Sequence, residues 1–331
     1  MNNHKPNQLQ ISIFFRLWRW FIKDFLGIFS EMRFSYLPPL MVYFAAGVSG
    51  FTGIVESFYV KDELGLSAAF LASLGFWAGL PWALKMPIGH LVDLFWRRKA
   101  FFVYFGASLM AISLLIMVAL TGYREYVEQF FSAELWYIIA MLLAPVGFVI
   151  QDVVADAMTV EAVPTRDESG KAIPEEELKR MHITMQTLGR IAIIGGSALV
   201  AGLGGWLAGT LSYKVMYEVA LIIPVISVIG VTLGQITLYI RRQRMEKQGI
   251  EESVILESLH QEDIITEPNY HILGGSALFI VLSVGLGLTS FGFKKEAIFT
   301  GSLMVIGYLM RQLFKDLDPI KVKEILGTEL A

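Results

Sequence analysis

Long apolar stretches separated by short polar segments dominate this chain. Each stretch is unbroken and shows no alternation of polar and apolar positions, which favours helices over strands. A helix needs about 20 apolar residues to cross the roughly 30 Å hydrocarbon layer of a bilayer. The pattern therefore predicts an all-α, polytopic membrane helix bundle with eight transmembrane helices. They are expected near residues 39–60, 67–95, 100–122, 135–160, 186–210, 215–240, 271–293 and 296–313.

Polar segments divide this bundle into parts. We expect a cytoplasmic amphipathic segment at 1–36, a six-helix transmembrane bundle at 37–240, a cytoplasmic linker at 241–270, two further transmembrane helices at 271–314 and a cytoplasmic tail at 315–331. The first segment mixes aromatic and basic residues, as helices lying on a membrane surface do. Packing of that helix against the bundle fits the pattern equally well.

Composition points in the same direction. Of the 331 residues, 55% are hydrophobic and 17% are charged, whereas soluble domains carry about 25% charged residues. The net charge of −3 gives no sign of a nucleic-acid partner. The chain has no Cys, which excludes disulfides and thiolate metal sites. We predict no cofactor and no metal site, and a lipid bilayer as surroundings.

The distribution of Lys and Arg predicts the orientation. With eight helices, 20 of these residues fall on the side that holds both termini and 5 fall on the other side. Because basic residues are enriched in cytoplasmic loops, both termini are expected in the cytoplasm. The expected location is a bacterial inner membrane.

Charged residues inside the predicted helices mark the candidate site, since each costs at least about 2.5–3.5 kcal/mol at the bilayer centre. At a rise of about 1.5 Å per residue, four of them fall in one layer near the midplane. The four are Lys85, Asp152, Asp156 and Arg190. Such a layer is tolerated where the charges face one another or a water-filled cavity.

Asp152 and Asp156 are four residues apart and share one helix face. Two like charges at that spacing repel, so one of them is suited to carry a proton. The alternative is a structural ion-pair cluster with Lys85 and Arg190 and without a mobile proton. Glu56 is predicted near the outer end of the first helix, where it either lines an external mouth or extends to the interface.

Two motifs resemble known transporters. The segment Gly89-His-Leu-Val-Asp93-Leu-Phe-Trp96-Arg97-Arg98-Lys resembles the cytoplasmic 2–3 loop of the major facilitator superfamily, with Trp96 in place of the usual Gly. In addition, Leu80-Pro-Trp-x-x-Lys85-x-Pro-x-Gly89 and Asp152-Val-Val-Ala-Asp156-Ala are similar to patterns of the folate–biopterin transporter family.

This resemblance implies a membrane transporter that moves small organic anions, such as folates or pterins, by alternating access. Lys85 and Arg190 would meet a solute carboxylate, while Asp152 or Asp156 would meet a pterin-like ring or a proton. In that superfamily the solute site lies between two six-helix halves. We therefore expect this chain to be truncated, split or paired with a second chain that supplies the missing half.

Two other functions compete with transport. A truncated or split membrane subunit that does not transport is the main rival to a carrier. An intramembrane aspartyl protease needs carboxylates from two helices that share a proton. Because Asp152 and Asp156 lie on one predicted helix, we predict that the protein is not an enzyme.

Overall fold

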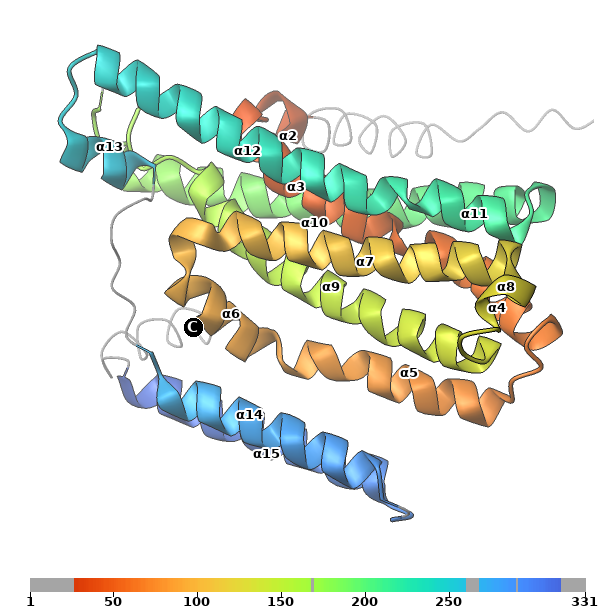
Figure 1. The fold of residues 1–331 in the computed structure, drawn as a ribbon. Helices are drawn as coiled ribbons and strands as arrows, with labels where there is room; N and C mark the ends of the chain where they lie inside the picture. Colours follow the sequence, from red (N-terminus) through yellow and green to blue (C-terminus); the bar gives the residue numbers. More distant parts are fainter. Residues whose placement is uncertain (1–26, 168–169, 260–267, 290, 317–331) are drawn as a thin grey trace, which may run out of the picture.

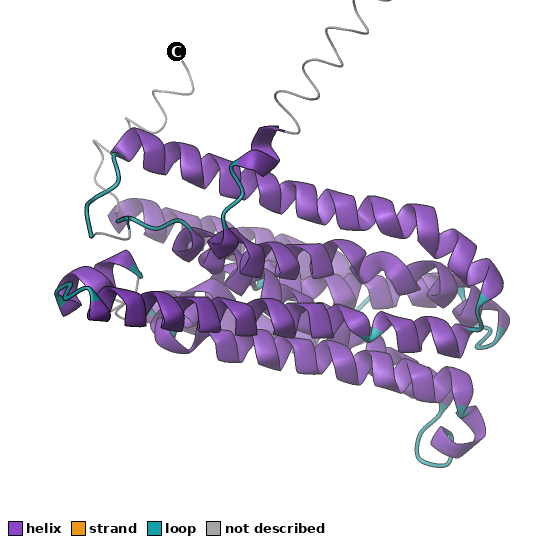
Figure 2. Ribbon diagram, turned by 90° about the horizontal axis from the view of Figure 1, so that it is seen from above, coloured by secondary structure: helices purple, strands orange, loops and turns teal. Residues whose placement is uncertain are grey.

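The computed structural model describes residues 27–167, 170–259, 268–289 and 291–316, and these residues form helices and no strand (Figure 2). Most of the predicted N-terminal segment (1–26) and the tail beyond residue 316 lie outside the described residues. The helices are α2 (Gly27–Ser30), η2 (Phe34–Tyr36), α3 (Leu37–Val48), η3 (Ser49–Thr52), α4 (Gly53–Asp62), α5 (Ala68–Ala83), α6 (Lys85–Leu94), η4 (Trp96–Arg98), α7 (Lys99–Gly122), α8 (Arg124–Val127), α9 (Ala133–Ala162), α10 (Glu175–Thr210), α11 (Tyr213–Ala220), α12 (Ile222–Lys247), α13 (Glu252–Ser258), α14 (Tyr270–Gly287) and α15 (Lys294–Asp316).

Six helical segments of the described chain are long and apolar enough to cross a membrane. They correspond to six of the eight predicted ranges, and they confirm an all-α polytopic membrane bundle. The predicted helix at 67–95 is instead divided at Leu84 into α5 and α6. The predicted helix at 296–313 is present as α15, but α15 is not among these six segments.

Two prolines explain the division at Leu84. A proline cannot donate a helical hydrogen bond, and its ring clashes with the carbonyl four residues earlier. Pro87 therefore leaves the carbonyl of Ala83, the last residue of α5, without its usual donor. At the end of α5, the N–H of Leu84 donates to the carbonyl of Pro81, three residues earlier, at 3.0 Å. Lys85 consequently becomes the first residue of a new helix.

Glycines allow the closest helix crossings. Gly106 of α7 faces Gly147 of α9, and a Cβ built on either residue would collide with the carbonyl oxygen of the other. Helices α3 and α10 also cross closely, because a Cβ on Gly47 would collide with the carbonyl oxygen of Ile193 and a Cβ on Gly196 would lie 3.0 Å from the backbone of Gly47. Because α3 also packs against α9 and α12, it lies at the centre of the bundle. Backbones that approach this closely require residues without a side chain.

The last two helices pack against each other and lie along α5 and α6, on the side of the bundle away from α12 (Figure 1). Two contacts hold α14 there. The N–H of Asn269 donates to Nε2 of His90 at 2.9 Å, and Gly287 faces the ring of Trp77. Helices α14 and α15 thus cover the broken second span.

Candidate functional site

Three of the predicted midplane charges meet in the structure. Nζ of Lys85 on α6 lies 2.5 Å from Oδ2 of Asp152 and 2.9 Å from Oδ2 of Asp156, both on α9. The hydroxyl of Tyr43 on α3 donates to Oδ1 of Asp156 at 2.6 Å. We call Lys85, Asp152, Asp156 and Tyr43 the central cluster. The lysine lies between two carboxylates on successive turns, so it offsets the repulsion expected at their spacing.

Local backbone structure positions each member of the cluster. Lys85 follows directly after the break at Leu84, which turns its side chain toward α9. Gly89, one turn later, faces α9, and a Cβ there would make an ordinary contact with the side chain of Val153 at 3.8 Å. Asp152 and Asp156 share one face of an uninterrupted helix. The break therefore presents a cation to a rigid pair of acids.

The central cluster is not sealed. The side chains of Lys85, Asp152 and Asp156 are 40%, 16% and 51% exposed. Lys85 also lines a cavity of about 310 Å³ between the α5–α6 break and helices α14 and α15, which contribute Ser276 and Ser302. This volume lies at the lower end of the range of small-molecule sites. The cluster can therefore be reached by water and by a small solute.

Arg190 lies near this cluster without joining it. It follows Gly189 of α10, where a Cβ would lie 2.9 Å from the ring of Tyr43. Its side chain is exposed and forms no ion pair or hydrogen bond with any residue that the structure describes. The layer expected from helical rise thus contains one lysine bound to two carboxylates, and the guanidinium of Arg190 lies apart from them.

Glu56 faces inward from α4. Its Oε1 accepts a hydrogen bond of 2.8 Å from the hydroxyl of Tyr137 on α9. Its side chain lines a small internal cavity rather than extending to the interface. Sequence reasoning identified Glu56 by its charge, but it did not identify the tyrosine that binds it.

The 2–3 loop motif lies at the other end of the same helices. Gly89 and Asp93 belong to α6, and Asp93 forms no ion pair among the described side chains. Arg98 is exposed on η4, while the side chain of Arg97 lies outside the described part of the structure. The next residue, Lys99, forms a buried ion pair with Glu161 of α9.

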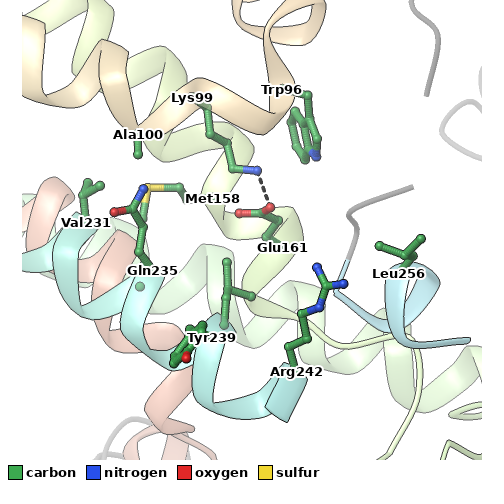
Figure 3. Close-up of a pocket in the computed structure, with 12 residues that line it drawn as sticks. Trp96, Lys99, Ala100, Met158, Glu161, Val231, Gln235, Tyr239, Arg242 and Leu256 are labelled. Atoms are coloured by element: carbon green, nitrogen blue, oxygen red, sulfur yellow. Dashed lines mark hydrogen bonds and ion pairs between the residues drawn. The ribbon is translucent and has the colours of Figure 1, made fainter. Parts of the chain in front are cut away.

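A larger cavity of about 500 Å³ opens next to this motif (Figure 3). It is lined by the pair Lys99–Glu161, by Trp96 and by Tyr239 and Arg242 of α12. Its charged groups already have partners, because Arg242 bonds to Glu246 at 2.8 Å and to Glu252 at 3.3 Å. The cavity contains no member of the central cluster, so we place the candidate solute site at the cluster despite its smaller cavity.

Comparison with known proteins identifies the family of this chain. A model of the BT1 family matches residues 46–269, which include all three charged members of the cluster. The chain belongs to the BT1 family. Together with its apolar helices, this membership makes it an integral, multi-pass membrane protein. The match confirms the resemblance to folate–biopterin transporters.

A relative of this BT1 family chain carries a functional name. It is the "Folate-biopterin transporter" of Synechocystis sp. (strain ATCC 27184 / PCC 6803 / Kazusa), which is 25% identical over 211 residues. The alignment covers 63% of this chain but 38% of the relative, so the chain spans well under half of that protein. No solved structure matches the chain.

Tyr43 is the member of the central cluster that sequence reasoning missed. Tyrosine in an apolar helix is common, because its ring packs in a core and its hydroxyl then needs a partner. Asp156 needs a hydrogen-bond donor from a facing helix, and this need is the signal that would have found Tyr43. The order of helices in the bundle, which decides that α3 faces α9, is not written in the residues around Tyr43.

Proposed function

We propose that this chain takes part in transport of small organic anions, of the folate or pterin class, across a bacterial inner membrane. The observation that carries the proposal is the ion pair of Lys85 with two carboxylates beside an accessible cavity. Charges within a membrane bundle generally mark solute or ion pathways. The name of the Synechocystis relative supports the substrate class.

The geometry suggests how a proton and an anion would bind together. Lys85 contacts both Asp152 and Asp156, so two negative charges compete for its single positive charge while both acids are ionised. Protonation of Asp156, the more exposed acid, removes one competing negative charge. Lys85 then becomes able to bind a solute carboxylate, assisted by Arg190. In this proposal the proton and the anion move together.

Alternating access requires a second wall opposite the exposed side of the cluster. We propose that a second chain supplies it, and that both termini of this chain lie in the cytoplasm. Asp156 and Arg190 would face that wall, since both are exposed. In the proposed carrier no step is enzymatic, and the solute leaves chemically unchanged.

Uptake of labelled folate and of other small anions tests this function in cells that naturally contain this chain, with its gene replaced by the unaltered or altered form, so that the proposed second chain is present. We expect uptake above background with the unaltered chain and its loss in Lys85→Ala and in Asp152→Asn. Lys61→Ala, at an exposed lysine of α4, serves as the control and should retain uptake. Equal uptake in all four forms, or none in any of them, would contradict the proposal.

Proton coupling is tested separately with membrane vesicles. An inward proton gradient should stimulate folate uptake by the unaltered chain several-fold. Asp156→Asn should abolish this stimulation while uptake without a gradient persists. Stimulation that survives in Asp156→Asn would show that this carboxylate does not carry the proton.

A further inference from the structure

Another carboxyl group lies inside the bundle, in surroundings that differ from those of the central cluster. Glu56 of α4 lines a cavity of about 60 Å³ together with Ser49 and Thr52 of η3, Ser113 of α7 and Tyr217 of α11. We call this cavity with Glu56, Tyr137 and Tyr217 the inner pocket. It lies among apolar side chains of α7, α9 and α11.

Tyr217 is the unusual member of the inner pocket. It is 2% exposed, and its hydroxyl has no hydrogen-bond partner among the described residues. A buried hydroxyl without a partner is destabilising, because it has lost its hydrogen bonds to water. Tyr137, in contrast, donates its hydroxyl to Oε1 of Glu56 at 2.8 Å. One oxygen of the Glu56 carboxyl group therefore has a donor, and Tyr217, whose hydroxyl is unused, lines the same cavity.

The described residues give Glu56 no counter-charge. It forms no ion pair, and α10 carries no titratable residue after Arg190. The titratable groups around the pocket are the tyrosines Tyr59, Tyr137 and Tyr217. On the walls formed by η3 and α7, the lining residues carry hydroxyl or apolar side chains.

Charged groups at this end of the bundle are already engaged elsewhere. Arg124 bonds to Glu128 at 2.9 Å and to the carbonyl of Glu63 at 3.1 Å. Lys214 bonds to the hydroxyl of Tyr123 at 2.9 Å and lies 3.6 Å from Glu218. Lys61 and Glu134 are exposed. An ionised Glu56 would thus be a charge in an apolar interior with one hydrogen bond, a state that proteins avoid by neutralising the group.

We propose that Glu56 is protonated in the folded protein and that the inner pocket is a proton-binding site. Oε1 accepts from Tyr137, and the acidic O–H on Oε2 donates into the cavity toward the hydroxyl oxygen of Tyr217. The cavity is large enough to admit water, which needs roughly 10–15 Å³, so a bridging water can complete this link. A proton fits this chemistry better than a metal cation, because the pocket offers one carboxyl group and hydroxyls.

The position of the pocket links the proton to the first transmembrane span. The 3₁₀ segment η3 interrupts that span immediately before α4, and mid-helix 3₁₀ turns often mark hinges. Ser49 and Thr52 of η3 line the same cavity as Glu56. Loss of the proton would leave a carboxylate that attracts both tyrosine hydroxyls, which lie on α9 and α11. The proposal concerns Glu56 alone and holds whether or not the central cluster binds a solute.

Infrared spectroscopy of the purified protein in detergent with potassium chloride at neutral pH tests the proposal. We expect a C=O band of a protonated carboxylic acid that disappears in Glu56→Gln. Glu134→Gln, at an exposed glutamate on α9, is the matched control and should retain the band. The proposal is overturned if the band is absent from the unaltered protein or persists in Glu56→Gln.

Two further measurements keep the test decisive if Glu56→Gln fails to fold. Tyr137→Phe removes one hydrogen bond to the carbonyl oxygen, so it should shift the same band to higher frequency; an unshifted band contradicts the assignment to Glu56. Exchange of potassium for sodium chloride should leave the band unchanged. Loss of the band in sodium would identify a sodium site and overturn the proton site.

Discussion

The central cluster and the inner pocket hold carboxyl groups in the same helix bundle under opposite conditions. In the central cluster, Lys85 neutralises two acids that remain partly exposed. In the inner pocket, the described residues give Glu56 a single hydroxyl donor and no cation. Helix α9 contributes to both, with Asp152 and Asp156 in one and Tyr137 in the other.

This contrast shows that burial and compensation decide what an intramembrane acid can do. An acid that is ion-paired and reachable from outside can exchange its partner for a solute. An acid enclosed among hydroxyls is suited to exchange a proton rather than an organic solute, because its 60 Å³ cavity is far smaller than the roughly 300–1,000 Å³ of small-molecule sites. The same functional group, a carboxyl, therefore supports two different hypotheses in one chain.

The largest expected effect comes from the packing that both regions share. Helix α9 lies against α7 through Gly106 and Gly147, and a Cβ on Gly106 would lie 2.7 Å from the carbonyl oxygen of Gly147. We expect Gly106→Ala to destabilise the protein by about 3 kcal/mol, the upper range for overpacking. Thermal unfolding in detergent measures this. Gly205→Ala is the control, since a Cβ there meets no described atom within 4 Å, and equal stability of the two variants would contradict the prediction.

An intermediate effect is expected from Lys85→Met. This change leaves Asp152 and Asp156 four residues apart without their cation, so the folded state loses about 2 kcal/mol. That is less than the roughly 3–5 kcal/mol of a fully buried pair, because Lys85 is 40% exposed.

The same thermal unfolding assay measures this loss. Adding Asp156→Asn to Lys85→Met should restore most of the stability by removing the repulsion. If the double variant is less stable than the single one, the charge balance described for the central cluster is wrong. Glu56→Gln should cost little by comparison, because it keeps an uncharged group in the inner pocket.

The smallest effects concern the two hydroxyl donors. Tyr137→Phe removes the one described donor to Glu56, and we expect a loss of about 1 kcal/mol. Tyr43→Phe should cost less, because Asp156 keeps Lys85 and its exposed face. Unfolding of the two purified variants side by side measures the difference. A larger loss of stability in Tyr43→Phe than in Tyr137→Phe would contradict this prediction.

Much of the fold could be predicted because a long, unbroken hydrophobic run crosses a bilayer as a helix. The charged candidates could also be found, since each charge in such a run is conspicuous. Other features depended on partners distant in sequence. Gly196 and Gly205 look alike in the chain, yet Gly196 packs against Gly47 and Gly205 faces no described atom within 4 Å.

By itself the sequence determined most of the helices and the height of Lys85, Asp152, Asp156 and Arg190 along them, because rise along a helix is constant. The division of the predicted span 67–95 at Leu84 appeared only in the structure. The tertiary structure alone decided which of these charges meet, that Arg190 remains separate and that Glu56 points inward to Tyr137. The physical reason is that the height of a residue along its helix axis follows from its position in that helix alone. The direction in which a side chain points depends on how each helix is rotated and which helix packs beside it.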